Sequence, residues 1–452
     1  MRRPLLVLLL PLAGLLSLPC AAAPPADLDA RIEREAASLE ALYRHLHQNP
    51  ELSYHEVATA ARIATELREA GYQVTTEFGA FADPALTSHG VVAVLKNGAG
   101  PTLLVRTELD ALPIEERTGL PYASMVKTKN DLGQEVAVMH GCGHDVHMTV
   151  FVGVARLLAS LRASWSGTLV LIGQPAEEIA PGGAEAMLRA GLYEKFPRPD
   201  FALALHDDAG LAAGKVGWVE GYTFANVDTV DITIRGVGGH GAYPHATRDP
   251  VVIAAEVVLQ LQTIASREVR PGEMVVVTVG SIHGGTKHNI IPDEVKLQLT
   301  VRTYKDDVRR TVLAAIERIT RNVVEAAGVP PERAPLIDLH PEKLVPATYN
   351  DPELTRRVVG AFRKSLGEDA VVQGVPVAGG EDFSHFGLTQ PRVPCFQFEL
   401  GAVDPERVAE AARTGAALPS LHSSQFAPVP APTIRTGVKA MVTAALELLG
   451  KK

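Results

Sequence analysis

Cysteine, positive charge and long apolar segments are all scarce in this chain. Of its 452 residues only three are cysteines, and 43 Lys and Arg are outnumbered by 52 Asp and Glu, for a net charge of −9. This balance argues against nucleic acid or an anionic membrane surface as a partner. Beyond the N-terminus no segment has the roughly 20 uninterrupted apolar residues that a membrane span needs, so no permanent membrane anchor is expected.

The N-terminus has the composition of a secretory leader. Arg2 and Arg3 precede an apolar run over residues 5–18, and small residues follow at 21–23. This order predicts a signal peptide over residues 1–23 and export, to a periplasm or out of the cell. Lipid attachment at Cys20 is the less favoured alternative, because Pro19 occupies the preceding position, where a small residue is required.

The length of the chain predicts two domains. Apolar strands alternate with amphipathic helices in the first half of the sequence, which indicates an α/β domain whose mostly parallel sheet is covered by helices on both faces. The strands are expected at residues 91–95, 103–106, 169–173 and 201–205, and the helices at 29–48, 56–70 and 147–161. This domain is expected to comprise residues 27–221 and 341–452.

Residues 222–340 have a different pattern. Residues 227–235 alternate as a half-buried strand, and the elements that follow complete a βαββαβ order, typical of a ferredoxin-like α+β module. The remaining strands are expected at residues 274–282, 294–304 and 336–339, and the helices at 250–266 and 307–327. We therefore expect a small lid or dimerisation domain inserted into the larger one.

The densest group of metal-binding side chains lies at residues 139–147, which contain a thiol, three imidazoles and a carboxylate. Cys142 and His144 are separated by one glycine, which allows the backbone to bend around an ion. Glu177, Glu178 and His206 follow other predicted strands, and such strand ends meet at one edge of an α/β sheet. A disulfide between Cys142 and Cys395 is the alternative for the two cysteines beyond the leader.

A series of short motifs, in order along the chain, resembles the metal-dependent amidohydrolase and carboxypeptidase family of hippurate hydrolase, indoleacetyl-amino-acid hydrolases and N-acyl-amino-acid hydrolases. The motifs lie at residues 44–52, 110–113, 118–122, 140–145, 174–178, 239–245, 289–292 and 380–383, and at His422. The chain departs from the family where Glu108 replaces the usual Asp, and Gly141 and Gly241 replace the common Ala.

The resemblance implies a set of site residues. Two divalent ions, Zn²⁺ or Mn²⁺, are expected on five ligands: Cys142, His144, Glu178, His206 and His422. Glu177 is the expected general base and Asp110 a carboxylate that orients a ligand. His240 resembles the family histidine that reaches the substrate across a homodimer interface, and Asn289 and Arg302 are candidates for binding the substrate carboxylate.

These expectations define a two-metal hydrolase that cleaves the amide bond of N-acyl amino acids or small peptides with a free carboxylate. A dipeptidase or carboxypeptidase that uses the same residues is the nearest alternative. A metal-dependent binding protein without catalysis is less favoured, because Glu177 is present.

Overall fold

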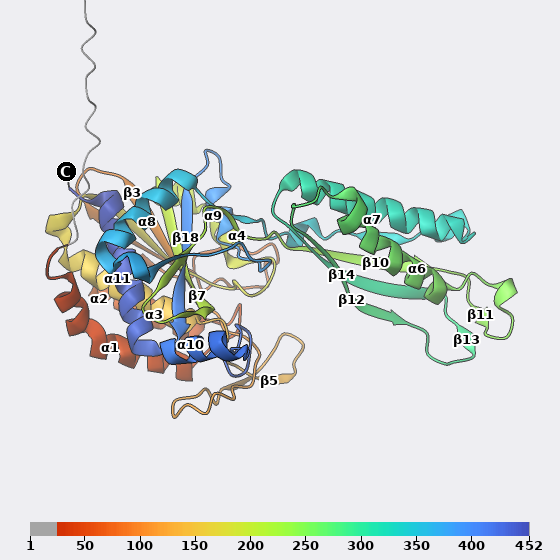
Figure 1. Cartoon of the computed structure of the whole chain (residues 1–452), viewed down its shortest axis with the longest axis horizontal. Helices are drawn as coiled ribbons and strands as arrows, with labels where there is room; N and C mark the ends of the chain where they lie inside the picture. Colours follow the sequence, from red (N-terminus) through yellow and green to blue (C-terminus); the bar gives the residue numbers. More distant parts are fainter. Residues whose placement is uncertain (1–24, 452) are drawn as a thin grey trace, which may run out of the picture.

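The computed structural model describes residues 25–451, which form a larger and a smaller lobe (Figure 1). The predicted leader, residues 1–23, lies outside the described residues, so export stays a prediction. Within residues 25–451, no helix combines the length and the apolar character that crossing a bilayer requires.

The larger lobe is built on an eight-stranded sheet. Its order is β1-β2-β6-β3-β7-β18-β8-β17. In sequence these strands are β1 (Gln73–Thr75), β2 (Val91–Asn97), β3 (Thr102–Glu108), β6 (Gly167–Gln174), β7 (Phe201–Ala212), β8 (Val216–Trp218), β17 (Val371–Gln373) and β18 (Cys395–Val403). The expected core strands are thus present, and short strands that the sequence analysis did not predict extend the sheet at both edges.

The centre of this sheet is parallel and its flanks are partly antiparallel. β6, β3, β7 and β18 all run the same way, whereas β2 is antiparallel to β6, and β8 to β18. Only residues 98–101 join β2 to β3, and a parallel crossover needs a dozen residues or more. These two consecutive strands therefore have to run in opposite directions.

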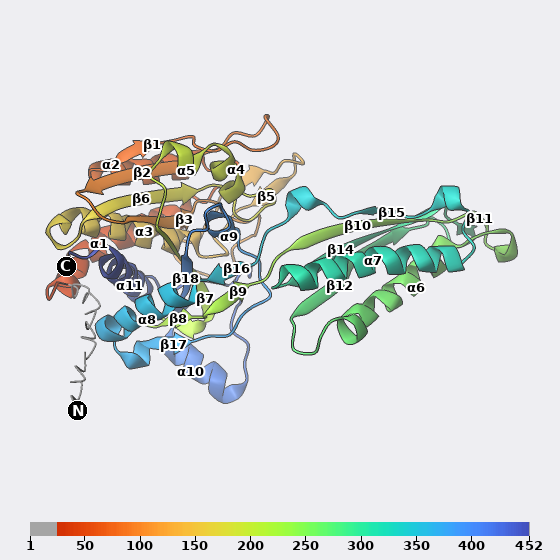
Figure 2. The ribbon, with the colours of Figure 1, turned by 90° about the horizontal axis from the view of Figure 1, so that it is seen from above.

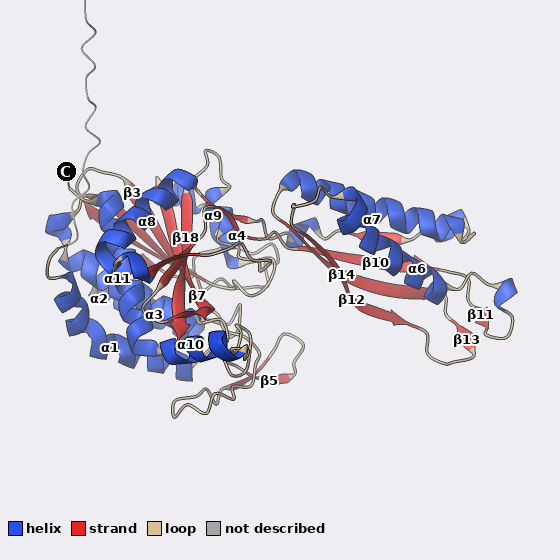
Figure 3. Cartoon of the chain, viewed as in Figure 1, coloured by secondary structure: helices blue, strands red, loops and turns tan. Residues whose placement is uncertain are grey.

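Helices cover both faces of the sheet, as Figures 1 and 3 show. Alternate strand residues belong to two apolar clusters: Val105 and Leu171 to the larger one, Leu104 and Val170 to the other. The larger cluster includes α1 (Leu28–Gln48), α2 (Val57–Glu69), α3 (His144–Ser160), α8 (Pro352–Leu366) and α11 (Pro430–Leu449). The other includes α4 (Gly183–Arg189), α5 (Leu192–Lys195) and α9 (Ser384–Gly387). The α/β fold expected from the sequence is confirmed.

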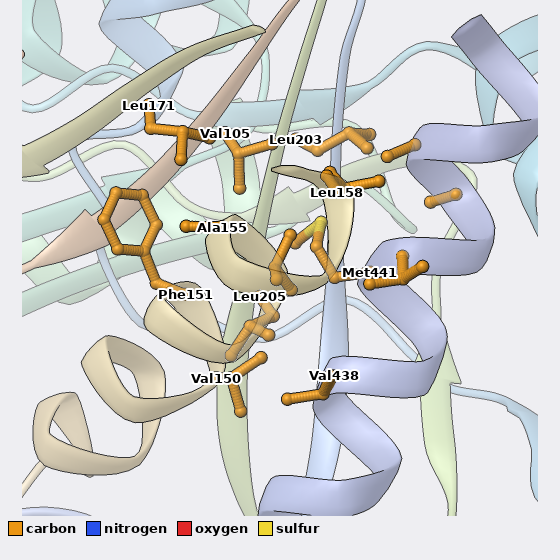
Figure 4. Close-up of a cluster of buried hydrophobic side chains, with 14 of the residues drawn as sticks. Val105, Val150, Phe151, Ala155, Leu158, Leu171, Leu203, Leu205, Val438 and Met441 are labelled. Carbon is orange, nitrogen blue, oxygen red and sulfur yellow. The ribbon is translucent and has the colours of Figure 1, made fainter. Parts of the chain in front are cut away.

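Helix α3 lies at the centre of the larger apolar cluster. In Figure 4 its side chain Val150 faces Val438 of α11, and Leu158 lies near Leu203 of the sheet. Phe151 lies on the side of α3 away from α11. Close approach of the neighbouring helices depends on Gly153, because a Cβ there would lie 2.7 Å from Val438 and 2.9 Å from Leu39. The packing of α1 and α11 thus fixes the position of α3, the helix that begins within the cluster of metal-binding residues.

The smaller lobe has the βαββαβ order expected from the sequence. Its antiparallel sheet, in the order β12-β14-β10-β15, contains β10 (Asp228–Arg235), β12 (Val275–Gly284), β14 (Glu294–Thr303) and β15 (Leu336–Asp338). Helices α6 (Pro250–Thr263) and α7 (Asp306–Ala326) pack on it. Val230, Ile232 and Ile234 are buried against these helices, so the predicted alternation along β10 is confirmed.

Two further strand pairs are relevant to the site. The chain leaves the larger lobe through β9 (Gly221–Phe224) and returns through β16 (Thr348–Asn350), and these strands pair side by side. A hairpin of β4 (Lys127–Lys129) and β5 (Glu135–Ala137) projects from the larger lobe, as the label of β5 marks in Figure 2.

Replacing Gly153 by Val should destabilise the protein by about 1–3 kcal/mol, because the added side chain overpacks the contact of α3 with α1 and α11. Gly360, inside α8, is the matched control, since a Cβ there has no atom within 4 Å. Gly360→Val makes the same change of helix propensity without the clash. Chemical denaturation of both variants measures the difference, and equal unfolding free energies would contradict the role given to Gly153.

Candidate metal centre

The cluster at residues 139–147 ends in the first turn of α3. Gly143 has φ +81° and precedes the helix, and a Cβ on it would lie 2.5 Å from Oδ2 of Asp207. Only glycine meets both conditions without strain. The helix therefore begins at His144, three residues before the predicted start at residue 147, and Cys142 lies in the turn before it.

The five predicted ligands come together in the structure. The Sγ atom of Cys142 lies 3.5 Å from Nε2 of His206 and 3.3 Å from Nε2 of His422. Oε1 of Glu178 lies 3.4 Å from Nε2 of His422 and 3.9 Å from Nε2 of His144. Side chains from positions 142 to 422 thus converge on one small volume at the edge of the sheet.

The cluster divides into overlapping groups, and in each group the donor atoms lie within 4.8 Å of one another. Three of these groups contain at least two predicted ligands: Cys142, His144 and His206; Cys142, Glu178 and His422; and His144, Glu177 and Glu178. Cys142 and His144 each belong to two of these groups, so the groups adjoin one another. The Nε2 atom of His144 and Oε1 of Glu178 are buried without a hydrogen-bond partner among the described residues, which is costly unless an ion binds them. The donor set therefore fits two divalent metal ions.

The rings of His144 and His206 are oriented by backbone carbonyl oxygens that lie close to their Nδ1 atoms. Nδ1 of His144 lies 2.8 Å from the carbonyl oxygen of Asp110, and Nδ1 of His206 lies 2.9 Å from that of Asp207. Each ring thereby directs Nε2 toward Cys142 or Glu178, the usual arrangement of metal-binding imidazoles. The Asp110 carboxylate in turn accepts hydrogen bonds from Ser53 Oγ at 2.7 Å and from the backbone N–H of Glu178 at 3.0 Å.

The position of His422 is fixed by the conformation and the hydrogen bond of its own backbone. Its φ of +63° is uncommon for a residue other than glycine, and its N–H donates to the carbonyl oxygen of Gly141 at 2.8 Å. Such strained conformations cluster at functional sites. The loop that carries His422 is therefore tied directly to the turn that carries Cys142.

Glu177 lies on the side of the cluster where other carboxylates gather. Its oxygen is 4.0 Å from Nε2 of His144, and it forms a group with Glu381 and Asp382. Burial raises the pKa of Glu177 well above its ordinary value, and the charges of Glu381, Glu178 and Asp382 act in the same direction. A carboxylate in this environment is suited to accept a proton and to release it again.

A fully buried arginine holds these carboxylates in place. Arg106 donates to Glu381 at 2.8 Å, to Asp382 at 3.0 Å and to Glu108. Its Nε donates to Gln174 Oε1 at 2.9 Å. The side chain of Gln174 also donates to both oxygens of Asp382, at 2.7 and 2.8 Å. The guanidinium thus joins β3, the end of β6 and the loop that contains Glu381 and Asp382.

Two other buried histidines near the ligands, His147 and His47, have structural partners. Nδ1 of His147 lies 2.9 Å from Glu108, and its Nε2 accepts the backbone N–H of Asp207 at 2.9 Å. His47 lies between Asp145 at 2.6 Å and Glu116 at 3.1 Å. Burial opposes a charge on His47, but the hydrogen bonds to the two carboxylates raise its pKa to about 10. His47 is therefore an imidazolium that neutralises Asp145.

The disulfide alternative is wrong. Cys142 and Cys395 are both free and buried. Cys395 begins β18, where its thiol lies 3.4 Å from the carbonyl oxygen of Val393, whereas Cys142 lies among the imidazoles. Burial raises the pKa of the Cys395 thiol to about 12, so it remains a neutral apolar group of the core.

Of the three predicted substrate contacts on the smaller lobe, His240 and Asn289 lie together and Arg302 lies apart from them. His240, in β11 (Gly239–His240), is exposed and lies beside Asn289, whose carbonyl oxygen accepts the N–H of Gly241 at 2.9 Å. Figure 1 shows β11 and β13 (Ile290–Ile291) at the end of the lobe farthest from the large sheet. Arg302 instead lies at the junction of the lobes, where a Cβ on Gly380 would be 3.3 Å from its Nη1.

Sequence reasoning gave no role to Arg106, Asp207 or the pair Glu381–Asp382. Arg106 is a single charge inside an apolar strand, and no neighbouring sequence feature indicates its three carboxylate partners. Asp207 directly follows His206, and the strand was expected to end before both. β7 instead continues to Ala212 because residues 202–208 pair with β18, so His206 lies within a strand rather than after one.

Overlapping ligand sets with a carboxylate beside them, at the edge of an α/β sheet, define a two-metal hydrolase. Residues 104–413 match the model of Peptidase family M20/M25/M40. The chain belongs to this family, and it is a metal-dependent enzyme that hydrolyses linear amides. The metal-dependent class expected from the sequence is confirmed.

Relatives and solved structures agree with this assignment. The chain is 32% identical to thermostable carboxypeptidase 2 of Saccharolobus solfataricus over 88% of this chain and 94% of the relative. It is 37% identical to an N-acetyl-L-cysteine deacetylase of Bacillus subtilis over 76% of each chain. The structure matches the YXEP protein of Bacillus subtilis, described as a dinuclear metal-binding peptidase, with a TM-score of 0.71, 28% identity and coverage of 92% and 100%.

Replacing Arg106 by Met should destabilise the protein by about 3–5 kcal/mol, because it leaves buried carboxylates without their counter-charge. The control is Arg117→Met, which removes an ion pair with Glu115 in which both side chains are 68% exposed. The control should leave the unfolding midpoint unchanged. Chemical denaturation measures both, and an unchanged midpoint for Arg106→Met would contradict the role of the buried guanidinium.

Proposed function

We propose that the enzyme hydrolyses the amide bond of N-acyl amino acids, or of short peptides, that carry a free carboxylate. The observation that carries this proposal is the position of Glu177, which lies beside the ligand cluster and whose pKa is raised. Two divalent ions on Cys142, His144, Glu178, His206 and His422 would polarise the amide carbonyl and lower the pKa of a water molecule.

The chain supplies the proton transfers. Glu177 takes a proton from the attacking water as the new C–O bond forms at the amide carbon. It then delivers this proton to the nitrogen as the C–N bond breaks, which releases the amino acid and a carboxylic acid. Glu381 and Asp382 lie beside Glu177 and, by their charge, favour its protonated form between the two steps.

Arg302 is the proposed contact for the substrate carboxylate. Its guanidinium forms no ion pair with any described residue, and its Nε donates only to Thr300 Oγ1 at 3.1 Å. Burial lowers the pKa of Arg302, so a carboxylate ligand would be favourable there. Because Gly380, which faces Arg302, directly precedes Glu381, this guanidinium lies on the Glu177 side of the cluster.

The carboxypeptidase relative supports a peptide substrate as the alternative, and the deacetylase relative supports an N-acyl amino acid. Both reactions would use the same residues. Metal analysis of the purified enzyme, combined with a panel of N-acyl amino acids and dipeptides, distinguishes the substrates and the ions.

Glu177→Gln should lower kcat by about 10²–10⁴-fold, because the amide cannot accept the proton of the attacking water. Two bound metal ions per chain should remain, since the expected ligands are unchanged. Metal content and hydrolysis are measured on the same preparation. Unchanged hydrolysis with the metal retained would refute the assignment of Glu177.

We further propose that the enzyme acts as a homodimer. β12 is an edge strand of the small sheet, and Ile282 on it is 52% exposed. The adjacent helix α6 exposes Val252 and Leu259. An unpaired strand edge beside exposed apolar side chains is suited to pair with the same surface of a second copy. In such a dimer, His240 and Asn289 would serve the partner's site.

Mixing two inactive variants tests this dimer. His240→Ala and Glu177→Gln chains should each have low activity on their own. When equal amounts of both are combined, each mixed dimer contains one complete site, in which Glu177 comes from one chain and His240 from the other. Such a mixture should recover about a quarter of the wild-type activity. If each site were built from one chain, mixing would recover none.

A further inference from the structure

A cavity of about 200 Å³ opens next to the ligand cluster. Half of its lining is apolar and comes from three segments of the chain: Leu52, Ala111, Leu112, Pro113 and Ile179. Its volume is below the roughly 300–1,000 Å³ of pockets that enclose a whole drug-sized ligand. The cavity therefore has room for one part of a substrate, a group of several carbon atoms.

The cavity is continuous with the ligand cluster. Glu178, a predicted metal ligand, forms part of its wall. Leu112, on another side, packs toward the turn of Cys142, because a Cβ on Gly141 would lie 3.4 Å from its side chain and 3.7 Å from Cα of His422. A group in the cavity would thus be attached to an atom held at the metal ligands.

The hairpin of β4 and β5 completes the cavity on its outer side. Asn130 and Asp131, at the turn of this hairpin, line it together with His55. His55 Nε2 and Asp131 Oδ1 lie 3.1 Å apart and connect the hairpin to the segment after α1. The side chains of the hairpin therefore limit the length of any group that enters from the cluster.

The charges around the cavity decide which end of the substrate it takes. Its lining includes no Lys or Arg, and the ions that Glu178 is expected to bind would compensate its charge, so the cavity offers no charged partner to a free carboxylate. The unpaired guanidinium of Arg302 lies elsewhere, beside Gly380. The carboxylate end of the substrate is thereby directed to Arg302, and the opposite side of the amide bond faces the cavity.

We infer that this cavity binds an apolar acyl group of the substrate and sets its preferred size. The inference rests on the proposed function and adds the direction of binding, with the acyl chain against Ile179 and the carboxylate at Arg302. Each buried methylene should raise kcat/KM about fourfold until the cavity is full. Short acyl groups such as acetyl would leave most of it unused.

The test compares N-acetyl-, N-butanoyl-, N-hexanoyl- and N-benzoylalanine on the metal-loaded enzyme. The readout is the ratio of kcat/KM for the hexanoyl substrate to that for the acetyl substrate. Ile179→Trp fills the cavity and should lower this ratio about 10- to 200-fold. Ile179→Ala enlarges the cavity and should move the preference toward longer chains.

Leu388→Trp is the matched control. Leu388 and Ile179 are both 39% exposed, but Leu388 lines a separate cavity beside Cys395. This variant should leave the ratio unchanged. A ratio that stays within about twofold of wild type for Ile179→Trp, or that falls equally for Leu388→Trp, overturns the inference.

A failure of the proposed function has a different outcome. The wild-type enzyme would then hydrolyse none of the four substrates. Calorimetric binding of acetate, butanoate and hexanoate to the metal-loaded enzyme tests the cavity in that case. Affinity that increases with chain length in the wild type but not in Ile179→Trp supports the cavity as an acyl site, and affinity independent of chain length overturns it.

Discussion

The site depends on the buried positive charge of Arg106. Arg106 lies inside the sheet and pairs with carboxylates from two separate parts of the chain, Glu108 and the pair Glu381–Asp382. Burial alone would oppose a charge there, but these carboxylates raise the pKa of Arg106 above its ordinary value. The guanidinium thus stays charged and holds in place the loop that faces Glu177.

Negative charge nevertheless exceeds positive charge around the cluster. Asp110, Asp145, Glu177, Glu178 and Asp207 lie within or beside it, and the buried cations Arg106 and His47 are already paired with other carboxylates. Burial raises the pKa of Asp207, and the nearby charges of Asp145 and Glu108 raise it further. Bound cations of high charge would stabilise such a concentration of carboxylates, together with the thiol and the unpartnered imidazole nitrogens. The charge of the cluster therefore agrees with the metal site that the ligand geometry indicates.

The sequence predicts those features that have a local signal. Apolar runs located the central strands, the alternation along β10 identified the small sheet, and the ordered motifs led to the five side chains that converge. Features that depend on distant contacts were missed or misjudged. Gly143 starts α3 early because Asp207 approaches it, and β7 extends past His206 because β18 pairs with it. No local sequence pattern indicates the partners of Arg106. None indicates that His240 lies away from the cluster.

β18 is synthesised after the small lobe but lies between β7 and β8 in the middle of the large sheet. During synthesis of the small lobe, β7 therefore lacks this neighbouring strand. The strands of the small sheet are close in sequence and can pair as soon as they are made. His422 follows β18 in the chain. A chain interrupted before this point lacks one member of the ligand set, so the complete set exists only in chains that are almost complete.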